Sequence, residues 1–173
     1  MEDLLFSWSA IGDIKDGRPN LGPNTRVEVY RMMQFSMRAT LEGAYGKEQA
    51  AKLLFDSGRH AGLAFSYEML DKTLTLNAFI AQVQQKLEDF GVGILRVEKL
   101  DMENTSIVLT ISEDLDCSGL PVNGTTVCDF DEGFLQGVFY YYTAQNFDVK
   151  EIDCWSTGER TCRFAIKPIT SND

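Results

Sequence analysis

The stretch KEIDCWSTGERTCRF, residues 150–164, places two cysteines on either side of a short turn. The segments VKEIDCW and RTCRFAI flank the turn STGE, and this arrangement predicts an antiparallel β-hairpin. Cys154 and Cys162 lie directly opposite each other if the loop has three residues, and one residue out of register if it has two. The spacing therefore allows a disulfide, two core thiols or half of a metal site.

The chain before this hairpin changes from helical to strand-like patterns. Residues 1–24 read as a lead-in loop because they include most of the turn-rich segment GDIKDGRPNLGPNT, residues 12–25. Apolar residues then recur at helical spacing, and Gly43 and Gly46 are expected to end the first helix. The predicted elements are helices over 25–43, 47–70 and 75–90, a hairpin formed by 93–100 and 105–112, and a helix over 128–145.

This order, three helices, a hairpin, a helix and a final hairpin, predicts an α+β fold. We expect the N-terminal helices to pack on a small antiparallel sheet of hairpins, with the further helix between them. At 173 residues the chain suits one domain, residues 1–173, with a helical part over 25–91 and a second part over 92–167.

The composition argues against several classes of partner. The formal net charge of −10 disfavours binding to nucleic acid or to an anionic membrane, which relies on clustered Lys and Arg. The N-terminal residues lack the pattern of a signal peptide, and no apolar run is long enough to span a bilayer. We therefore expect a cytoplasmic protein, and because cytoplasmic thiols are normally reduced, a disulfide is disfavoured.

All four cysteines lie in the last third of the chain, at Cys117, Cys128, Cys154 and Cys162. Zinc takes four ligands from thiolate, imidazole and carboxylate groups, so the set is compatible with zinc, but buried free thiols are also common. The fourth ligand could be Cys117 or an acid. Glu151 precedes Cys154 by three residues and faces the opposite side of a regular strand, so it can join the site only if a bulge re-aims it.

Two segments resemble the four-vinyl-reductase domain family: CDFDEGFLQGVF, residues 128–139, and KEIDCWSTGERTCRFAI, residues 150–166. That family includes proteins of bacteriochlorophyll synthesis and the sensor domains of phenol- and xylene-responsive activators. The resemblance covers about residues 92–167 and implies the fold of Golgi transport-particle subunits and of haem-based nitric-oxide sensors. The matching positions are Cys128, Gly133, Gly137, Glu151, Cys154 and Cys162.

In the aromatic-sensing members of that family, the matching cysteine, glutamate and two cysteines bind a structural zinc ion. The resemblance thus implies zinc ligands at Cys128, Glu151, Cys154 and Cys162, with Cys117 left over as the alternative fourth ligand. Zinc with four protein ligands has no open position for catalysis. Gly133 and Gly137 are expected to let their helix lie close to a sheet or to another helix.

The predicted function is a stand-alone binding or sensor domain for an apolar, aromatic or tetrapyrrole small molecule. Aromatic and aliphatic residues of both parts could line its pocket, although each could equally belong to the core. The pocket candidates are Phe65, Phe79, Phe134, Val138, Tyr141, Phe147 and Trp155.

The family resemblance also implies a homodimer, for which the methionine-rich stretch from Tyr30 to Met37 is a candidate surface. A downstream signalling or biosynthetic protein is a further expected partner. Two other functions stay open: a vinyl reductase or accessory factor of chlorophyll and tetrapyrrole metabolism, and a structural tether without a ligand. Direct catalysis is not expected, because the sequence has no nicotinamide or flavin fingerprint.

Overall fold

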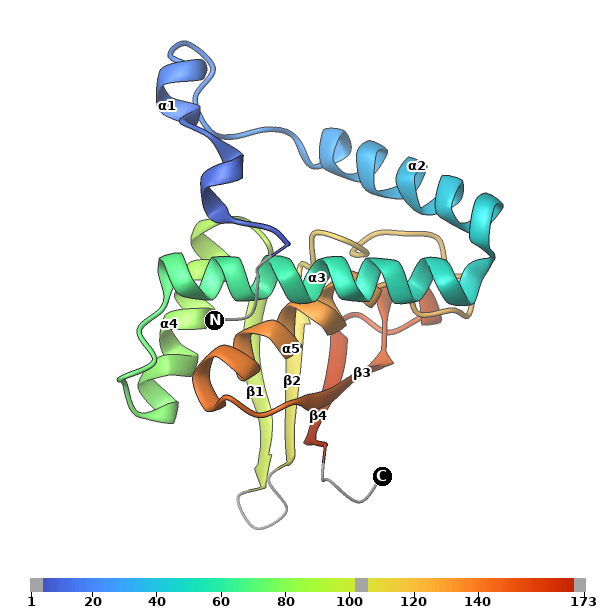
Figure 1. Cartoon of the computed structure of the whole chain (residues 1–173). Coiled ribbons are helices and arrows are strands. Elements are labelled where there is room, and N and C mark those ends of the chain that lie inside the picture. Colours follow the sequence, from blue (N-terminus) through green and yellow to red (C-terminus); the bar gives the residue numbers. More distant parts are fainter. Residues whose placement is uncertain (1–4, 102–105, 170–173) are drawn as a thin grey trace.

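The computed structural model describes residues 5–101 and 106–169 (Figure 1). Its elements follow in the order η1 (Trp8–Ile11), α1 (Ile14–Gly17), α2 (Val27–Tyr45), α3 (Lys47–Met69), α4 (Leu76–Asp89), β1 (Ile94–Asp101), β2 (Ser106–Ser112), α5 (Asp129–Thr143), β3 (Phe147–Asp153), η2 (Trp155–Thr157) and β4 (Cys162–Pro168). The predicted α+β class is confirmed. The segment predicted as a lead-in loop contains the two short turns η1 and α1.

The two hairpins join into one antiparallel sheet with the strand order β1-β2-β4-β3. β2 and β4 pair along the middle of the sheet, where Ile107 faces Ile166 and Ile111 faces Cys162. β2 buries every second residue, so the alternation in its sequence reflects one buried and one less buried face. The hydrophobic core lies between this sheet and the helices α4 and α5.

Helices α3 and α5 touch at glycines from both sides. A Cβ atom added at Gly133 of α5 would lie 1.9 Å from the carbonyl oxygen of Phe55, and one added at Gly58 of α3 would lie 2.0 Å from that of Phe130. Gly62 and Gly137 make similarly close backbone contacts in the next turn. The predicted close approach at Gly133 and Gly137 is therefore present, and the partner element is α3.

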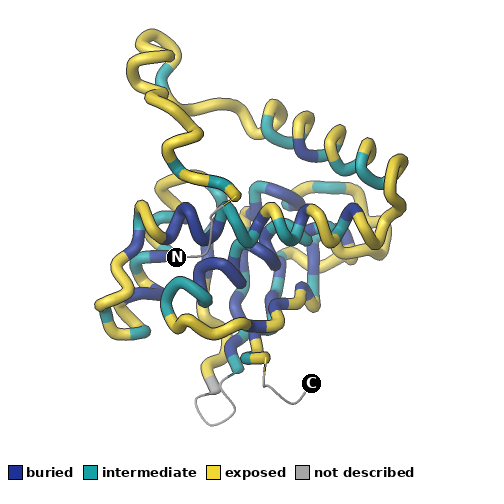
Figure 2. The backbone as a smooth tube through the Cα atoms, in the orientation of Figure 1, coloured by how far each residue is buried: buried dark blue, intermediate teal, exposed yellow. Residues whose placement is uncertain are grey.

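Helix α2 turns its polar side toward the rest of the protein. Along α2, all of which the structure describes, Gln34 is the one buried residue. Tyr30, Arg31, Gln34 and Arg38 hydrogen-bond to the segment 114–129, which precedes and opens α5. The opposite side carries Val29, Met32, Met33 and Met37, all exposed, and we refer to these four residues as the methionine face. Figure 2 shows α2 as a largely exposed arm.

The first long helix does not end at Gly43, as predicted, but continues to Tyr45. Gly46 ends it, because this residue has a φ of +81°, which favours glycine, and its N–H bonds to the carbonyl of Glu42. An added Cβ at Gly43 would meet no heavy atom within 4 Å. Among the helices of residues 5–101 and 106–169, none has the length and apolarity required to cross a bilayer.

Candidate metal centre

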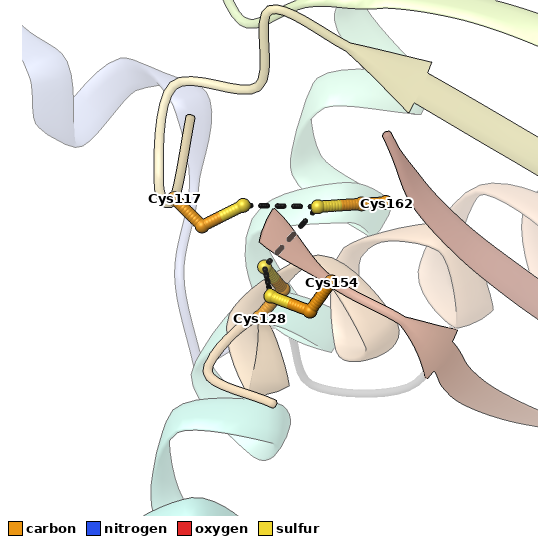
Figure 3. Close-up of side chains that lie close together, drawn as sticks. All are labelled: Cys117, Cys128, Cys154 and Cys162. Atoms are coloured by element: carbon orange, nitrogen blue, oxygen red, sulfur yellow. Dashed lines mark hydrogen bonds between the residues drawn. The ribbon is translucent and has the colours of Figure 1, made fainter. Parts of the chain in front are cut away.

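Four separate parts of the chain bring the cysteines together (Figure 3). Cys117 lies in the loop after β2, Cys128 is the N-cap of α5, Cys154 follows β3, and Cys162 begins β4. All four are buried, and their Sγ atoms lie within 4.8 Å of one another. We call these residues the four-thiol cluster.

The distances in the four-thiol cluster suit a tetrahedral metal. The Sγ atom of Cys128 lies 3.9 Å from those of Cys154 and Cys162, and the Sγ atoms of Cys117 and Cys162 are 2.9 Å apart. Zinc with bonds of about 2.3 Å to sulfur would separate its ligands by about 3.8 Å. Since a disulfide bond is only about 2.05 Å long, the cluster consists of free thiols.

The thiols influence one another's ionisation. Hydrogen bonds from Cys117, Cys128 and Cys162 lower the pKa of Cys154, whereas contacts with Cys117, Cys154 and Cys162 raise the pKa of Cys128. One thiolate is thus stabilised at the expense of the next, because like charges this close repel. A divalent cation is the partner that would allow all four to ionise together.

Glu151 lies beside this cluster. A bulge between Glu151 and Asp153 interrupts the pairing of β3 with β4, and this is the irregularity that the spacing required for Glu151 to turn inward. Glu151 is 4% exposed; its Oε2 accepts the N–H of Cys128 at 3.2 Å, and its Oε1 is buried without a hydrogen-bond partner. Burial, followed by the charge of Cys154, raises the pKa of Glu151 to about 8.

The predicted ligands Cys128, Cys154 and Cys162 therefore meet, and the leftover Cys117 joins them. The carboxylate of Glu151 borders the thiols, with its place as a ligand still a prediction. Sequence reasoning missed three further buried acids around the cluster, Asp114, Asp116 and Asp131. The segment EDLDC, which ends at Cys117, held the signal for the first two.

The pocket candidates are distributed over three environments. Phe79 and Val138 line an interior hollow of about 10 Å³ between α4, α5 and the sheet. Phe65, Phe134, Phe147 and Tyr141 pack against other aromatic rings in or beside the core. Trp155 instead lies under the guanidinium of Arg160 and lines an open surface groove of about 510 Å³.

Residues 107–168, from β2 to β4, match the model of the vinyl-4-reductase domain. The chain carries a vinyl-4-reductase domain. This match confirms the predicted resemblance to the four-vinyl-reductase family, and the matched segment contains the four-thiol cluster and Glu151.

Two uncharacterised proteins of Methanocaldococcus jannaschii are similar to the chain. MJ0150 is 25% identical over 115 residues, which are 66% of this chain and 63% of that protein. MJ1642 is 26% identical over 147 residues, 85% of this chain and 80% of that protein. The chain thus spans less than two thirds of MJ0150.

Two solved structures with vinyl-4-reductase-like folds are also similar. The phenol-responsive sensory domain of the activator PoxR, solved with phenol, has a TM-score of 0.64 and 16% identity, over 83% of this chain and 75% of that one. A vinyl-4-reductase family protein of M. jannaschii has the same TM-score and identity, over 96% and 99%.

Two more structures confirm the predicted likeness to Golgi-transport and nitric-oxide-sensing folds. Trafficking protein particle complex subunit 3 from Naegleria fowleri, covalently bound to palmitic acid, has a TM-score of 0.65 and 12% identity, over 83% of this chain and 95% of that one. An H-NOX protein from S. oneidensis has a TM-score of 0.54 and 14% identity, over 94% and 89%. At these identities the likeness concerns the fold.

Proposed function

We propose that this protein binds an apolar small molecule in the interior between α4, α5 and the sheet, and that a structural zinc ion supports that site. The observation that carries this proposal is the interior hollow, which is lined by apolar side chains alone. The lining residues are Phe79, Ile80, Val83, Leu95, Leu109, Leu135, Val138 and Phe139. The similar fold of the PoxR sensory domain, solved with phenol, supports a ligand of this class.

The four cysteines are the proposed zinc ligands. Four thiolates would complete a tetrahedron and leave no open position, so the ion would serve the structure rather than a reaction. It would link the loop after β2, the start of α5 and the last hairpin. Because α5 also lines the hollow through Leu135 and Val138, the ion would hold a wall of the binding site without touching the ligand.

The hollow must expand to hold a ring-sized ligand. Its volume of about 10 Å³ suits about one water-sized probe, whereas an engineered apolar cavity of about 150 Å³ binds benzene. We infer that side chains of α4, such as Phe79, move when the ligand enters. The energy of that movement lowers the affinity below what apolar burial alone would give.

We expect phenols, alkylbenzenes, fatty acids or tetrapyrroles to bind with micromolar affinity in calorimetric titrations of the zinc-loaded protein. Phe79→Ala should tighten binding at least tenfold, because the truncated side chain leaves the required space. Val138→Phe should weaken it at least tenfold by filling the hollow. Val97→Phe, the same substitution at an exposed position of β1, should leave the affinity unchanged.

A second candidate function, a structural tether without a ligand, is favoured by the small size of the hollow. If neither the wild-type protein nor Phe79→Ala binds any compound of the panel, the binding function is wrong and the tether takes its place. The outcome is informative because Phe79 is 1% exposed and its truncation must leave space inside the protein.

We also propose that a second copy of this chain covers the methionine face of α2. Methionine adapts to irregular partner surfaces, and Met32 is 69% exposed in the isolated chain. Sedimentation equilibrium should show a dimer that Met33→Glu converts to a monomer, because the new carboxylate would be buried in the interface. Gln145→Glu, an exposed change outside α2, should stay dimeric. A monomeric wild-type protein would contradict the proposal.

A further inference from the structure

Three buried carboxylates, Asp114, Asp116 and Asp131, surround one side of the four-thiol cluster. Asp114 and Asp116 belong to the loop after β2, and Asp131 lies in the first turn of α5. Buried carboxylates are rare unless a donor or a cation compensates their charge. We therefore followed the partners of each.

Asp116 has its partners in α2. The hydroxyl of Tyr30 donates to its Oδ1 at 2.7 Å, and the side-chain amide of Gln34 donates to its Oδ2. Asp114 is oriented by its own loop, since its Oδ1 accepts the N–H groups of Asp116 at 2.8 Å and of Cys117 at 3.0 Å. These two acids are therefore held in place by hydrogen bonds.

Asp131 lacks such compensation. It is 8% exposed, and its Oδ2 is buried without a hydrogen-bond partner. The charges that act on it are those of other acidic groups: Asp116, Asp114, Glu151 and Cys117, in decreasing order. An unpartnered oxygen among negative charges is the environment of a cation ligand.

The nearby arginines serve other oxygens. Arg31 donates to the carbonyls of Leu115 at 2.7 Å and Ser118 at 2.9 Å. Arg38 pairs with Asp129 at 2.8 Å and donates to the carbonyl of Val127 at 2.7 Å. These contacts fasten α2 to the loop and to the start of α5, and they leave Asp131 facing the thiols.

The ligand atoms of Asp114, Cys128 and Asp131 lie within 4.8 Å of one another. We propose that these three residues bind a second metal ion, which shares the thiolate of Cys128 with the zinc of the four-thiol cluster. A thiolate with two carboxylates suits zinc or a similar borderline divalent cation better than magnesium or calcium, which prefer oxygen alone. Three protein ligands also leave one coordination position for water or another small ligand.

This second site rests on the proposed zinc function of the four-thiol cluster, because Cys128 belongs to both. The second ion would bind the loop after β2 to α5 directly, through Asp114 and Asp131. With one shared thiolate and two carboxylates, it is the weaker of the two sites. A mild chelator should therefore remove it first.

The test is elemental analysis of the full chain after reduction, loading with Zn²⁺ and dialysis. We expect two zinc ions per chain in the wild-type protein and one in Asp131→Asn and in Asp114→Asn. Asp129→Asn is the matched control, because this acid lies in the same turn of α5 but pairs with Arg38, so it should keep both ions. Titration of the wild-type protein with a chelating dye should show two phases, and Asp131→Asn should lack the weaker one.

Thermal unfolding separates a metal ligand from a merely structural acid. In excess chelator, Asp131→Asn should melt at a higher temperature than the wild-type protein, because it removes an uncompensated buried charge. With saturating Zn²⁺ the order should reverse. A single zinc ion per chain that Asp131→Asn retains unchanged would overturn the second site and leave the four-thiol site standing, whereas a chain that binds no zinc would overturn both.

Discussion

Cys128→Ser, Cys154→Ser and Cys162→Ser should each abolish tight zinc binding and leave little folded protein at physiological temperature. The apparent binding energy of structural zinc reaches about 10–16 kcal/mol in zinc-finger peptides. A typical domain is stable by only about 5–15 kcal/mol, so one lost ligand removes a large share of the total. Circular dichroism melts with Zn²⁺ and with chelator, beside elemental analysis, measure the effect. In chelator, the variants and the wild-type protein should melt within a few degrees of one another.

A comparison of Cys117→Ser with Glu151→Gln identifies the fourth ligand. We expect Cys117→Ser to lose stability like the other three cysteine variants, because its Sγ lies in the four-thiol cluster. Glu151→Gln should keep the zinc ion, since an amide oxygen can still accept the N–H of Cys128. The reverse result, with zinc lost from Glu151→Gln and retained by Cys117→Ser, would assign the site to the carboxylate that the family resemblance implied.

The helices and strands were predictable because their signals are local. The period of apolar residues places α3 and α4 within two residues of their observed bounds. Gly43 shows the limit of such signals, since a glycine ends a helix only where the backbone adopts a conformation that others avoid, as at Gly46. Residue type alone does not distinguish the two glycines.

The candidate site was predictable in part. Cys128, Cys154 and Cys162 carry a spacing typical of the four-vinyl-reductase family, but Cys117 comes from a loop whose path depends on tertiary contacts. The same holds for Asp131, which reads in sequence as an ordinary acid of a helix N-terminus. Its burial follows from the position of α2 and of the loop after β2, which no local pattern encodes.

The pocket was the least predictable feature, because an aromatic residue can equally fill a core. Phe65 illustrates this: its ring packs against those of Trp8, Phe90 and Phe134, at centroid distances between 5.3 and 6.2 Å. Whether such a residue borders a hollow depends on how the helices pack on the sheet. In this protein that packing depends on the glycine contact between α3 and α5.

Gly133→Ala should destabilise the protein severely, although alanine is the better helix former. The added Cβ would lie 1.9 Å from the carbonyl oxygen of Phe55, a backbone atom that can move only if α3 and α5 separate. Overpacking a core costs about 1–3 kcal/mol and occasionally more, and a clash between two helix backbones belongs at the upper end. Because Cys128 caps α5, the displaced helix should also bind zinc more weakly.

Gly43→Ala is the matched control, since the same change in α2 meets no heavy atom within 4 Å. It should stabilise the protein by up to about 1 kcal/mol, the difference in helix propensity between the two residues. Urea unfolding of the zinc-loaded proteins should therefore move the midpoint down for Gly133→Ala and up for Gly43→Ala. If both variants gained stability, α3 and α5 would not be in backbone contact, and α5 would lose its role as the element that joins the metal centre to the wall of the binding site.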